Sequence, residues 1–156
     1  MTETDYDLLK SQLAAVWEGE HDALANTANF VALLYDALDE INWLGVYVLR
    51  GEELVLGPFQ GKAACVRIPL GKGVCGTSAQ LRQTQRVKDV HEFPGHIACD
   101  PVSRSELVVP LIADGCLLGV LDIDSPITDR FSGSDQQQIE SLCGLYLKAI
   151  DGQRFI

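Results

Sequence analysis

Apolar and polar positions alternate with the period of an α-helix over the first forty residues. The apolar positions of this pattern are Leu8, Leu9, Leu13, Val16, Leu24, Ala28, Val31, Leu34, Tyr35 and Leu38. Gly19 interrupts the pattern, and neither half contains proline. The sequence therefore predicts two consecutive helices, the second from about residue 21 to residue 38.

From residue 41 the pattern changes to short segments rich in β-branched and aromatic residues, which are typical of strands. Residues 42–49 and 54–60 predict a hairpin that turns at Gly51, and residues 65–68 predict a third strand. A second hairpin is predicted over residues 106–124, because Asp114 and Gly115 form a dipeptide that favours a two-residue turn.

The remaining segments complete the predicted order of elements. Residues 71–80 predict a glycine-rich turn that opens a short helix, and residues 85–101 predict mostly loop. Ser132 or Ser134 can cap a last helix that ends near Ile150. Two consecutive hairpins combined with helices predict an antiparallel sheet, so the fold class is α+β rather than doubly wound.

Composition restricts the partners of the chain. Its 156 residues, 47% hydrophobic and 22% charged, suit one globular domain. The net charge of −10 argues against nucleic acid and anionic membranes as partners. Apolar stretches such as 107–113 are too short to span a bilayer. The acidic N-terminus lacks the apolar region of a signal peptide, so we expect a cytoplasmic protein.

Five cysteines are the first sign of chemistry: Cys65, Cys75, Cys99, Cys116 and Cys143. In a reducing compartment, we expect them not to form permanent disulfides. Cys116 and Cys143 lie in apolar patterns, which suits small buried side chains. Cys75 lies at the expected start of a helix, where the helix dipole would lower its thiol pKa.

Two other segments invite a ligand-binding interpretation that their spacing does not support. Residues 71–77 (GKGVCGT) match a dinucleotide-binding string literally, but they do not follow a parallel strand. Residues 89–100 hold two histidines, a cysteine and acids, but lack the paired ligands of a zinc site, so we expect no metal. His96 can pack in this loop or act in catalysis, whereas His91 is expected to be exposed.

Acidic side chains occur where strands should be apolar. Asp122 and Asp124 are two residues apart, so they share one face of a strand, and Glu106 opens the neighbouring strand. One interpretation is that each of these acids lies at a strand end in contact with water and has no functional role. Together they would converge on a pocket that binds an ammonium group, holds a cation, or retains one proton because like charges raise a carboxyl pKa. Trp43 can belong to the core or to the pocket wall.

These residues stand in strings that resemble the free methionine-(R)-sulfoxide reductases, a family with the GAF fold. The likeness covers nearly the whole chain after the first helix. The strings are 41–45 (INWLG), 56–62 (LGPFQGK), 65 with 68, 71–77 (GKGVCGT), 89–90 (DV), 93–100 (FPGHIACD), 105–110 (SELVVP) and 119–124 (GVLDID). General GAF sensor domains share the layout without the three cysteines at positions 65, 75 and 99.

The resemblance implies one GAF domain over residues 1–156: N-terminal helices over 1–40, sheet and active-site loops over 41–131, and a C-terminal helix over 132–156. It implies a thiol enzyme that reduces free L-methionine-(R)-sulfoxide and is recycled by thioredoxin, without a cofactor. The implied site residues are Cys99 as the attacking thiolate, Cys65 as the resolving partner, Cys75 as an auxiliary or alternative cysteine, Trp43 against the substrate methyl group, and Glu106, Asp122 and Asp124 as substrate-binding acids.

This chemistry suits the residues present. A thiolate attacks the sulfoxide sulfur, and the departing oxygen needs protons that a crowded carboxyl cluster can supply. The cysteine is left as a sulfenic acid, which condenses with a second thiol to a disulfide that an external dithiol reduces. A flexible loop around Pro94 and Gly95 would help Cys65 and Cys99 to meet.

Two other functions remain open from the sequence. One is a GAF sensor that binds a small ligand without turnover, and the other is a thiol-based sensor of redox state or nitric oxide derivatives. A sensor usually needs an output domain, for which 156 residues leave no room, so the enzyme is favoured. The long N-terminal helices could also pair two copies of the chain in a homodimer.

Overall fold

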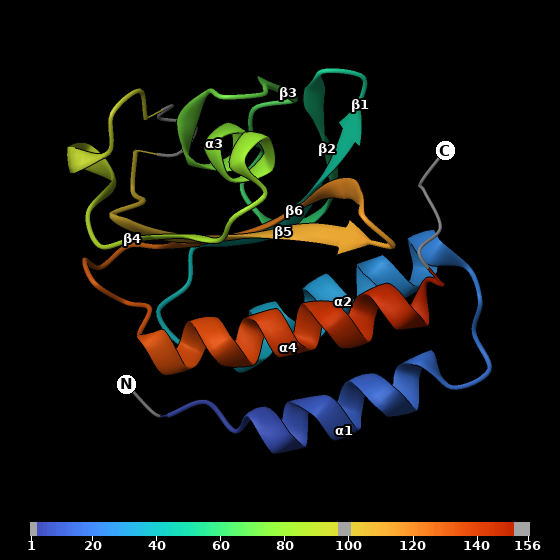
Figure 1. Ribbon diagram of the computed structural model, residues 1–156. Coiled ribbons are helices and arrows are strands. Elements are labelled where there is room, and N and C mark those ends of the chain that lie inside the picture. Colours follow the sequence, from blue (N-terminus) through green and yellow to red (C-terminus); the bar gives the residue numbers. More distant parts are fainter. Residues whose placement is uncertain (1–2, 97–100, 152–156) are drawn as a thin grey trace.

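The computed structural model describes residues 3–96 and 101–151. Within them, the chain forms an antiparallel sheet of six strands in the order β3-β2-β1-β6-β5-β4 (Figure 1). The elements are α1 (Tyr6–Trp17), α2 (Ala23–Ala37), β1 (Trp43–Arg50), β2 (Glu53–Gly61), β3 (Arg67–Pro69), α3 (Gly73–Leu81), β4 (Gln85–Val87), a 3₁₀ turn η1 (Val90–Glu92), β5 (Ser105–Ala113), β6 (Cys116–Ser125) and α4 (Gly133–Ala149). The predicted α+β class is confirmed. No helix in the described ranges is long and apolar enough to cross a membrane.

The sheet separates two apolar clusters. Helices α2 and α4 cover one face, with α1 packed outside them, and α3 lies on the opposite face (Figure 1). Alternate residues of the central strands enter alternate clusters: Leu107 and Ile123 contact the helical side, whereas Val108 and Val120 contact the α3 side. The face toward α3 is therefore the one that can present the acids of β5 and β6 to a pocket.

Both N-terminal helices are present, but their buried faces differ from the prediction. In α1, Leu9 and Leu13 are buried, whereas Leu8 is exposed. In α2, Leu24 is exposed and Thr27 is buried in its place. Thr27 is accommodated because its hydroxyl donates to the Ala23 carbonyl within the helix at 2.7 Å. A polar residue with an internal hydrogen bond can thus replace an apolar one on a buried face.

Two short strands also differ from the prediction. β3 begins at Arg67, so Cys65 lies in the irregular segment before it rather than in a strand. β4 pairs with β5 at the edge of the sheet, in a region expected to be loop. The second hairpin is confirmed, since Asp114 (φ 51°) and Gly115 (φ 76°) both adopt the left-handed conformation of a tight two-residue turn.

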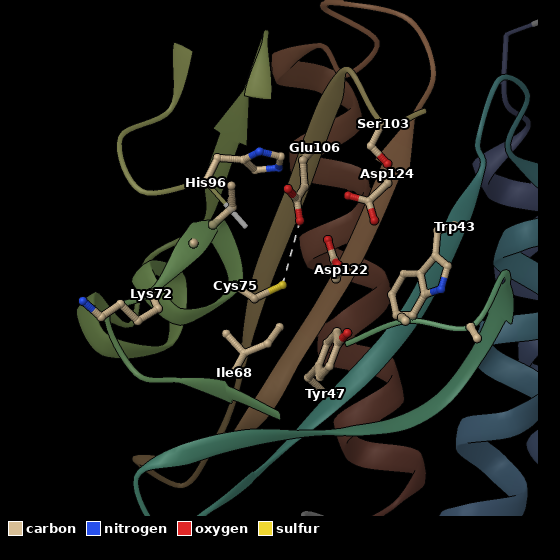
Figure 2. A pocket seen from close by; sticks show the side chains of 14 residues that line it. Trp43, Tyr47, Ile68, Lys72, Cys75, His96, Ser103, Glu106, Asp122 and Asp124 are labelled. Carbon is tan, nitrogen blue, oxygen red and sulfur yellow. Dashed lines mark hydrogen bonds between the residues drawn. The ribbon is translucent and has the colours of Figure 1, made fainter. Parts of the chain in front are cut away.

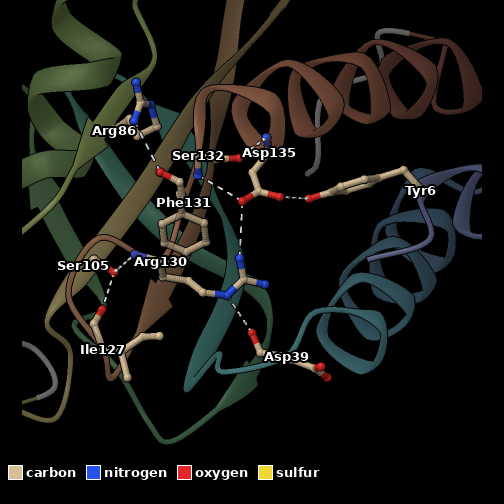
Figure 3. Close-up of polar contacts among 9 residues, drawn as sticks. All are labelled: Tyr6, Asp39, Arg86, Ser105, Ile127, Arg130, Phe131, Ser132 and Asp135. Carbon is tan, nitrogen blue, oxygen red and sulfur yellow. Dashed lines mark hydrogen bonds and ion pairs between the residues drawn. The ribbon is translucent and has the colours of Figure 1, made fainter. Parts of the chain in front are cut away.

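A polar network fixes the start of α4 against α1 (Figure 3). Ser132 caps the helix by accepting from the Asp135 backbone N–H at 3.0 Å, and Asp135 accepts from the Ser132 N–H in return. The Asp135 carboxylate also accepts from Tyr6 Oη at 2.8 Å and pairs with buried Arg130 at 3.4 Å. Arg130 Nε donates to the Asp39 carbonyl, so the network joins α1, α4 and the end of α2.

Candidate functional site

A pocket opens on the α3 face of the sheet (Figure 2). Its cavity volume is about 50 Å³, which is more than a single water molecule needs. The residues that line it are Trp43, Tyr47, Ala63, Ala64, Ile68, Lys72, Gly73, Val74, Cys75, His96, Ser103, Glu106, Asp122 and Asp124. Six candidate residues named from the sequence therefore share one pocket: Trp43, Cys75, His96, Glu106, Asp122 and Asp124.

The three carboxylates converge because of strand register. Glu106 pairs directly with Asp124 across β5 and β6, and Asp122 lies two residues before Asp124 on the same face. Glu106 and Asp122 are only 6% and 5% exposed, so they are not the solvated strand-end acids that the sequence left as an alternative. Figure 2 shows all three side chains pointing into the pocket.

Burial controls the protonation of this cluster. Removal from water, followed by repulsion from Asp122 and Asp124, raises the pKa of Glu106 well above its usual range. Burial also raises the pKa of Asp122, although hydrogen bonding with Glu106 acts in the opposite direction. Glu106 is therefore the acid best able to keep a proton near neutral pH, with Asp122 beside it as an acceptor.

Cys75 lies in the first turn of α3, with Sγ donating to Glu106 Oε2 at 3.9 Å. The expectation that the helix dipole lowers its pKa is wrong. Burial, followed by the negative charges of Asp122 and Glu106, raises the pKa of the thiol well above its usual value. A buried site beside carboxylates outweighs the dipole of a nine-residue helix, so Cys75 is held as a neutral thiol.

An aromatic stack forms the opposite wall of the pocket. The indole of Trp43 stacks on Phe59 (5.4 Å between ring centroids) and on Tyr47 (5.8 Å). Gly45 allows this arrangement, because a Cβ there would lie 2.6 Å from the indole and 2.5 Å from Phe59 Cβ. Trp43 is thus buried in the core and lines the pocket at once, which joins the two roles that the sequence left open.

The other cysteines differ in their surroundings. Cys65 is half-buried beside the pocket wall and is joined in a disulfide. Cys99, the expected attacking thiolate, lies outside the described residues. Cys143 is buried as expected, but Cys116 is exposed, because it begins β6 directly after the hairpin turn. Cys75, Cys116 and Cys143 are free thiols.

One ligand atom from each of Cys75, Glu106 and Asp122 lies within 4.8 Å of the other two. A thiol and two carboxylates could hold a borderline-soft divalent cation once they lose their protons. Asp122 Oδ1 is buried without a hydrogen-bond partner in the described part of the chain. That oxygen could bind either a metal ion or an ammonium group. The absence of a bound metal, expected from the sequence, therefore stays a prediction.

Sequence reasoning missed several lining residues. Tyr47 follows Trp43 by four positions in β1, so the period of two that placed the acids on one face would also have found it. Lys72 and Ser103 come from segments whose pattern gives no such signal. His96 reaches the pocket, where burial lowers its pKa and favours a neutral ring, whereas His91 is exposed as expected.

The chain is similar in sequence and in fold to known proteins. The family model described as GAF domain matches residues 2–150. A free methionine-R-sulfoxide reductase of Escherichia coli is 53% identical over 137 residues, which cover 88% of this chain and 83% of the relative. The reduced form of fRMsr of Staphylococcus aureus superposes with a TM-score of 0.92 at 54% identity, covering 96% of this chain and 99% of that chain. Free methionine-R-sulfoxide reductase from Neisseria meningitidis, in complex with its substrate, has a TM-score of 0.89 at 40% identity and covers 97% and 93%.

Proposed function

Since the chain belongs to the GAF family and, within it, to the free methionine-R-sulfoxide reductases, we propose that it reduces free L-methionine-(R)-sulfoxide to L-methionine by thiol chemistry. The observation that carries this proposal is the pocket in which a buried, proton-retaining acid cluster faces an aromatic wall. Such a pocket offers both a proton for the sulfoxide oxygen and an apolar surface for the methyl group.

Substrate recognition follows from the charges. The α-ammonium of a free amino acid is attracted to Asp122 and Asp124, and the unpartnered Asp122 Oδ1 gains a donor when it binds. A methionine within a peptide has no α-ammonium, so the cluster selects the free amino acid. The indole of Trp43 packs against the methyl group of the substrate.

The proposed first step transfers oxygen from substrate to enzyme. The Cys99 thiolate attacks the sulfoxide sulfur while the sulfoxide oxygen takes the proton of Glu106. The resulting adduct carries a hydroxyl and the Cys99 sulfur on the substrate sulfur. The hydroxyl then moves to the cysteine sulfur, the sulfur–oxygen and sulfur–sulfur bonds of the substrate sulfur break, and methionine leaves with the electron pair while the cysteine becomes a sulfenic acid. The raised pKa of Glu106 favours this step, because the carboxyl keeps its proton to a higher pH than an ordinary glutamic acid does.

The second step closes a disulfide. The Cys65 thiol attacks the sulfenic sulfur, the sulfur–sulfur bond forms and water leaves. A disulfide at Cys65, with Cys75, Cys116 and Cys143 free, supports Cys65 as the resolving residue. Cys75 remains auxiliary, since its neutral thiol is poorly suited to attack. Thioredoxin, a dithiol protein of the cytoplasm, is the proposed reductant that returns both thiols.

The proposal is tested by turnover of the two separated epimers of free methionine sulfoxide with thioredoxin, its reductase and NADPH. Consumption of the R epimer alone, with a sulfoxide-containing peptide left unchanged, is the expected result. A Cys65→Ser chain should release about one methionine per enzyme and then stop. If the fully reduced wild-type chain consumes neither epimer, the proposal fails and a ligand-sensing GAF module becomes the better interpretation.

A further inference from the structure

Two aromatic side chains of the pocket wall also hold the segment that carries Cys65. Tyr47 Oη donates to the carbonyl of Cys65 at 2.8 Å, and Trp43 Nε1 donates to the carbonyl of Lys62 at 3.0 Å. Both donors come from the same face of β1, four positions apart. One strand at the middle of the sheet therefore anchors this segment near both of its ends.

The segment needs such anchors because it has left the sheet. Residues 62–66 connect β2 to β3 without regular secondary structure, and Lys62 and Ala63 are exposed. Gly61 makes the departure possible, with φ at 124° and a position where a Cβ would lie 2.7 Å from the indole of Trp43. Backbone carbonyls that lose their strand partners take side-chain donors instead.

Tyr47 is well suited to this task. Its ring is 2% exposed and stacks on Trp43, so packing fixes the position of the hydroxyl. Burial, followed by the negative charge of Asp122, raises the pKa of Tyr47, and the phenol keeps the proton that it donates. The bond is present while Cys65 is joined in its disulfide, so it belongs to the oxidised form of the protein.

We propose that Tyr47, assisted by Trp43, is a positioning residue that holds the 62–66 segment so that Cys65 closes its disulfide. The inference rests on the proposed function for the reaction in which that disulfide forms. In that reaction the Cys65 sulfur bonds to the sulfenic sulfur, the sulfur–oxygen bond breaks and water leaves. Holding the segment in place raises the effective concentration of the attacking thiol without contacting the reacting atoms.

A matched pair of variants tests the proposal. Tyr47→Phe removes only the donating hydroxyl, and Tyr35→Phe removes the same atom from a half-buried tyrosine of α2 on the other side of the sheet. The reduced full-length chains are equilibrated with oxidised and reduced dithiothreitol, which exchange two electrons and two protons with the protein, and the Cys65 disulfide is measured by mass spectrometry. Thermal unfolding of each variant shows whether the fold is retained.

Tyr47→Phe should lower the equilibrium constant for the disulfide about fivefold, the effect of one ordinary hydrogen bond, and Tyr35→Phe should leave it unchanged. With substrate, Tyr47→Phe should slow disulfide closure more than it slows release of the first methionine. The sulfenic acid, trapped with a 1,3-dicarbonyl reagent, should persist about fivefold longer. These two readings separate positioning of Cys65 from a general loss of stability.

Two results would overturn the inference. An unchanged disulfide equilibrium in Tyr47→Phe would mean that the hydroxyl does not position Cys65. Equal slowing of first methionine release and disulfide closure would mean that Tyr47 acts on the substrate instead. Failure of the wild-type chain to release any methionine overturns the proposed function alone, since the dithiothreitol equilibrium uses no substrate and still decides the role of Tyr47.

Discussion

Glu106 shows how burial sets the chemistry of a single residue. Its carboxyl lies opposite Asp124, beside Asp122, and accepts from the Cys75 thiol. Burial and the negative charges of Asp122 and Asp124 disfavour its ionised form and outweigh the hydrogen bond that the thiol donates. The expected outcome is an acid that is protonated in the resting enzyme.

The first prediction concerns activity. Glu106→Gln keeps the size of the side chain but removes the proton, so kcat/KM should fall about 100-fold. Wild-type activity should fall as the pH rises through the raised pKa of Glu106, because the acid then loses its proton. The variant should lack this decrease. Glu18→Gln, at an exposed position after α1, serves as the control. If the activity of Glu106→Gln decreases with pH in the same way, the decrease arises from the titration of another side chain.

The second prediction concerns stability. The pKa of Glu106 is higher in the folded chain than the unfolded value of about 4.3, so the folded state binds more protons between the two values. The stability that this proton contributes is present below pH 4 and decreases as the pH rises. Glu106→Gln should therefore resist urea better than wild type at pH 8, with the difference vanishing near pH 4. Equal urea midpoints at pH 8 would contradict this.

Residue types and spacing could predict which acids meet, but not their environment. The two-residue spacing of Asp122 and Asp124 is enough to place both on one face. The pKa of Cys75 and the exposure of Cys116 were predicted wrongly. Both depend on which distant residues pack around the thiol, and a local pattern of apolar residues does not contain that information.

At the scale of elements, long patterns were predicted reliably, whereas the short strand β3 was predicted to begin two residues too early and β4 was missed. The four helices and both hairpins follow from periodicity, turn chemistry and caps such as Ser132. β3 and β4 are three residues each, too short to show a period, and they exist because a longer strand offers them hydrogen bonds. The start of β3 at Arg67 is what leaves Cys65 in an irregular segment.

The third prediction concerns the start of α4. Ser132→Ala removes one cap bond and should lower the free energy of unfolding by about 1 kcal/mol. Asp135→Ala removes the same capping box and leaves Tyr6 and buried Arg130 without their acceptor, so it should cost about 3 kcal/mol. Urea unfolding of both variants measures the difference. Equal losses would show that the ion pair with Arg130 contributes nothing beyond the cap.

At the scale of the whole molecule, the two faces of the sheet have different roles. The helical side forms a continuous apolar cluster under α1, α2 and α4, and the opposite side carries the pocket. The α+β class could be predicted because two hairpins exclude a parallel sheet. The position of the pocket between α3 and β1 could not be predicted from the sequence, because it depends on how the helix packs on the sheet.

The fourth prediction concerns thiol reactivity over the whole chain. Among the free cysteines that the structure describes, Cys116 is exposed and Cys75 and Cys143 are buried with raised pKa values. A maleimide reagent added to the native, oxidised chain should label Cys116 within minutes and the other two only after unfolding. Peptide mapping by mass spectrometry locates the label. Rapid labelling of Cys143 would contradict its burial on the inner face of α4.

The alternation of β6 has a further consequence for how the chain finds its native pairing. Leu121 and Ile123 face the helical cluster, whereas Asp122 and Asp124 face the pocket. Sliding β6 by one residue against β1 would exchange these sets and drive two carboxylates into an apolar interior. The two acids proposed to bind the substrate thus also penalise misaligned sheets, so replacing both with leucine should cost folding fidelity as well as activity.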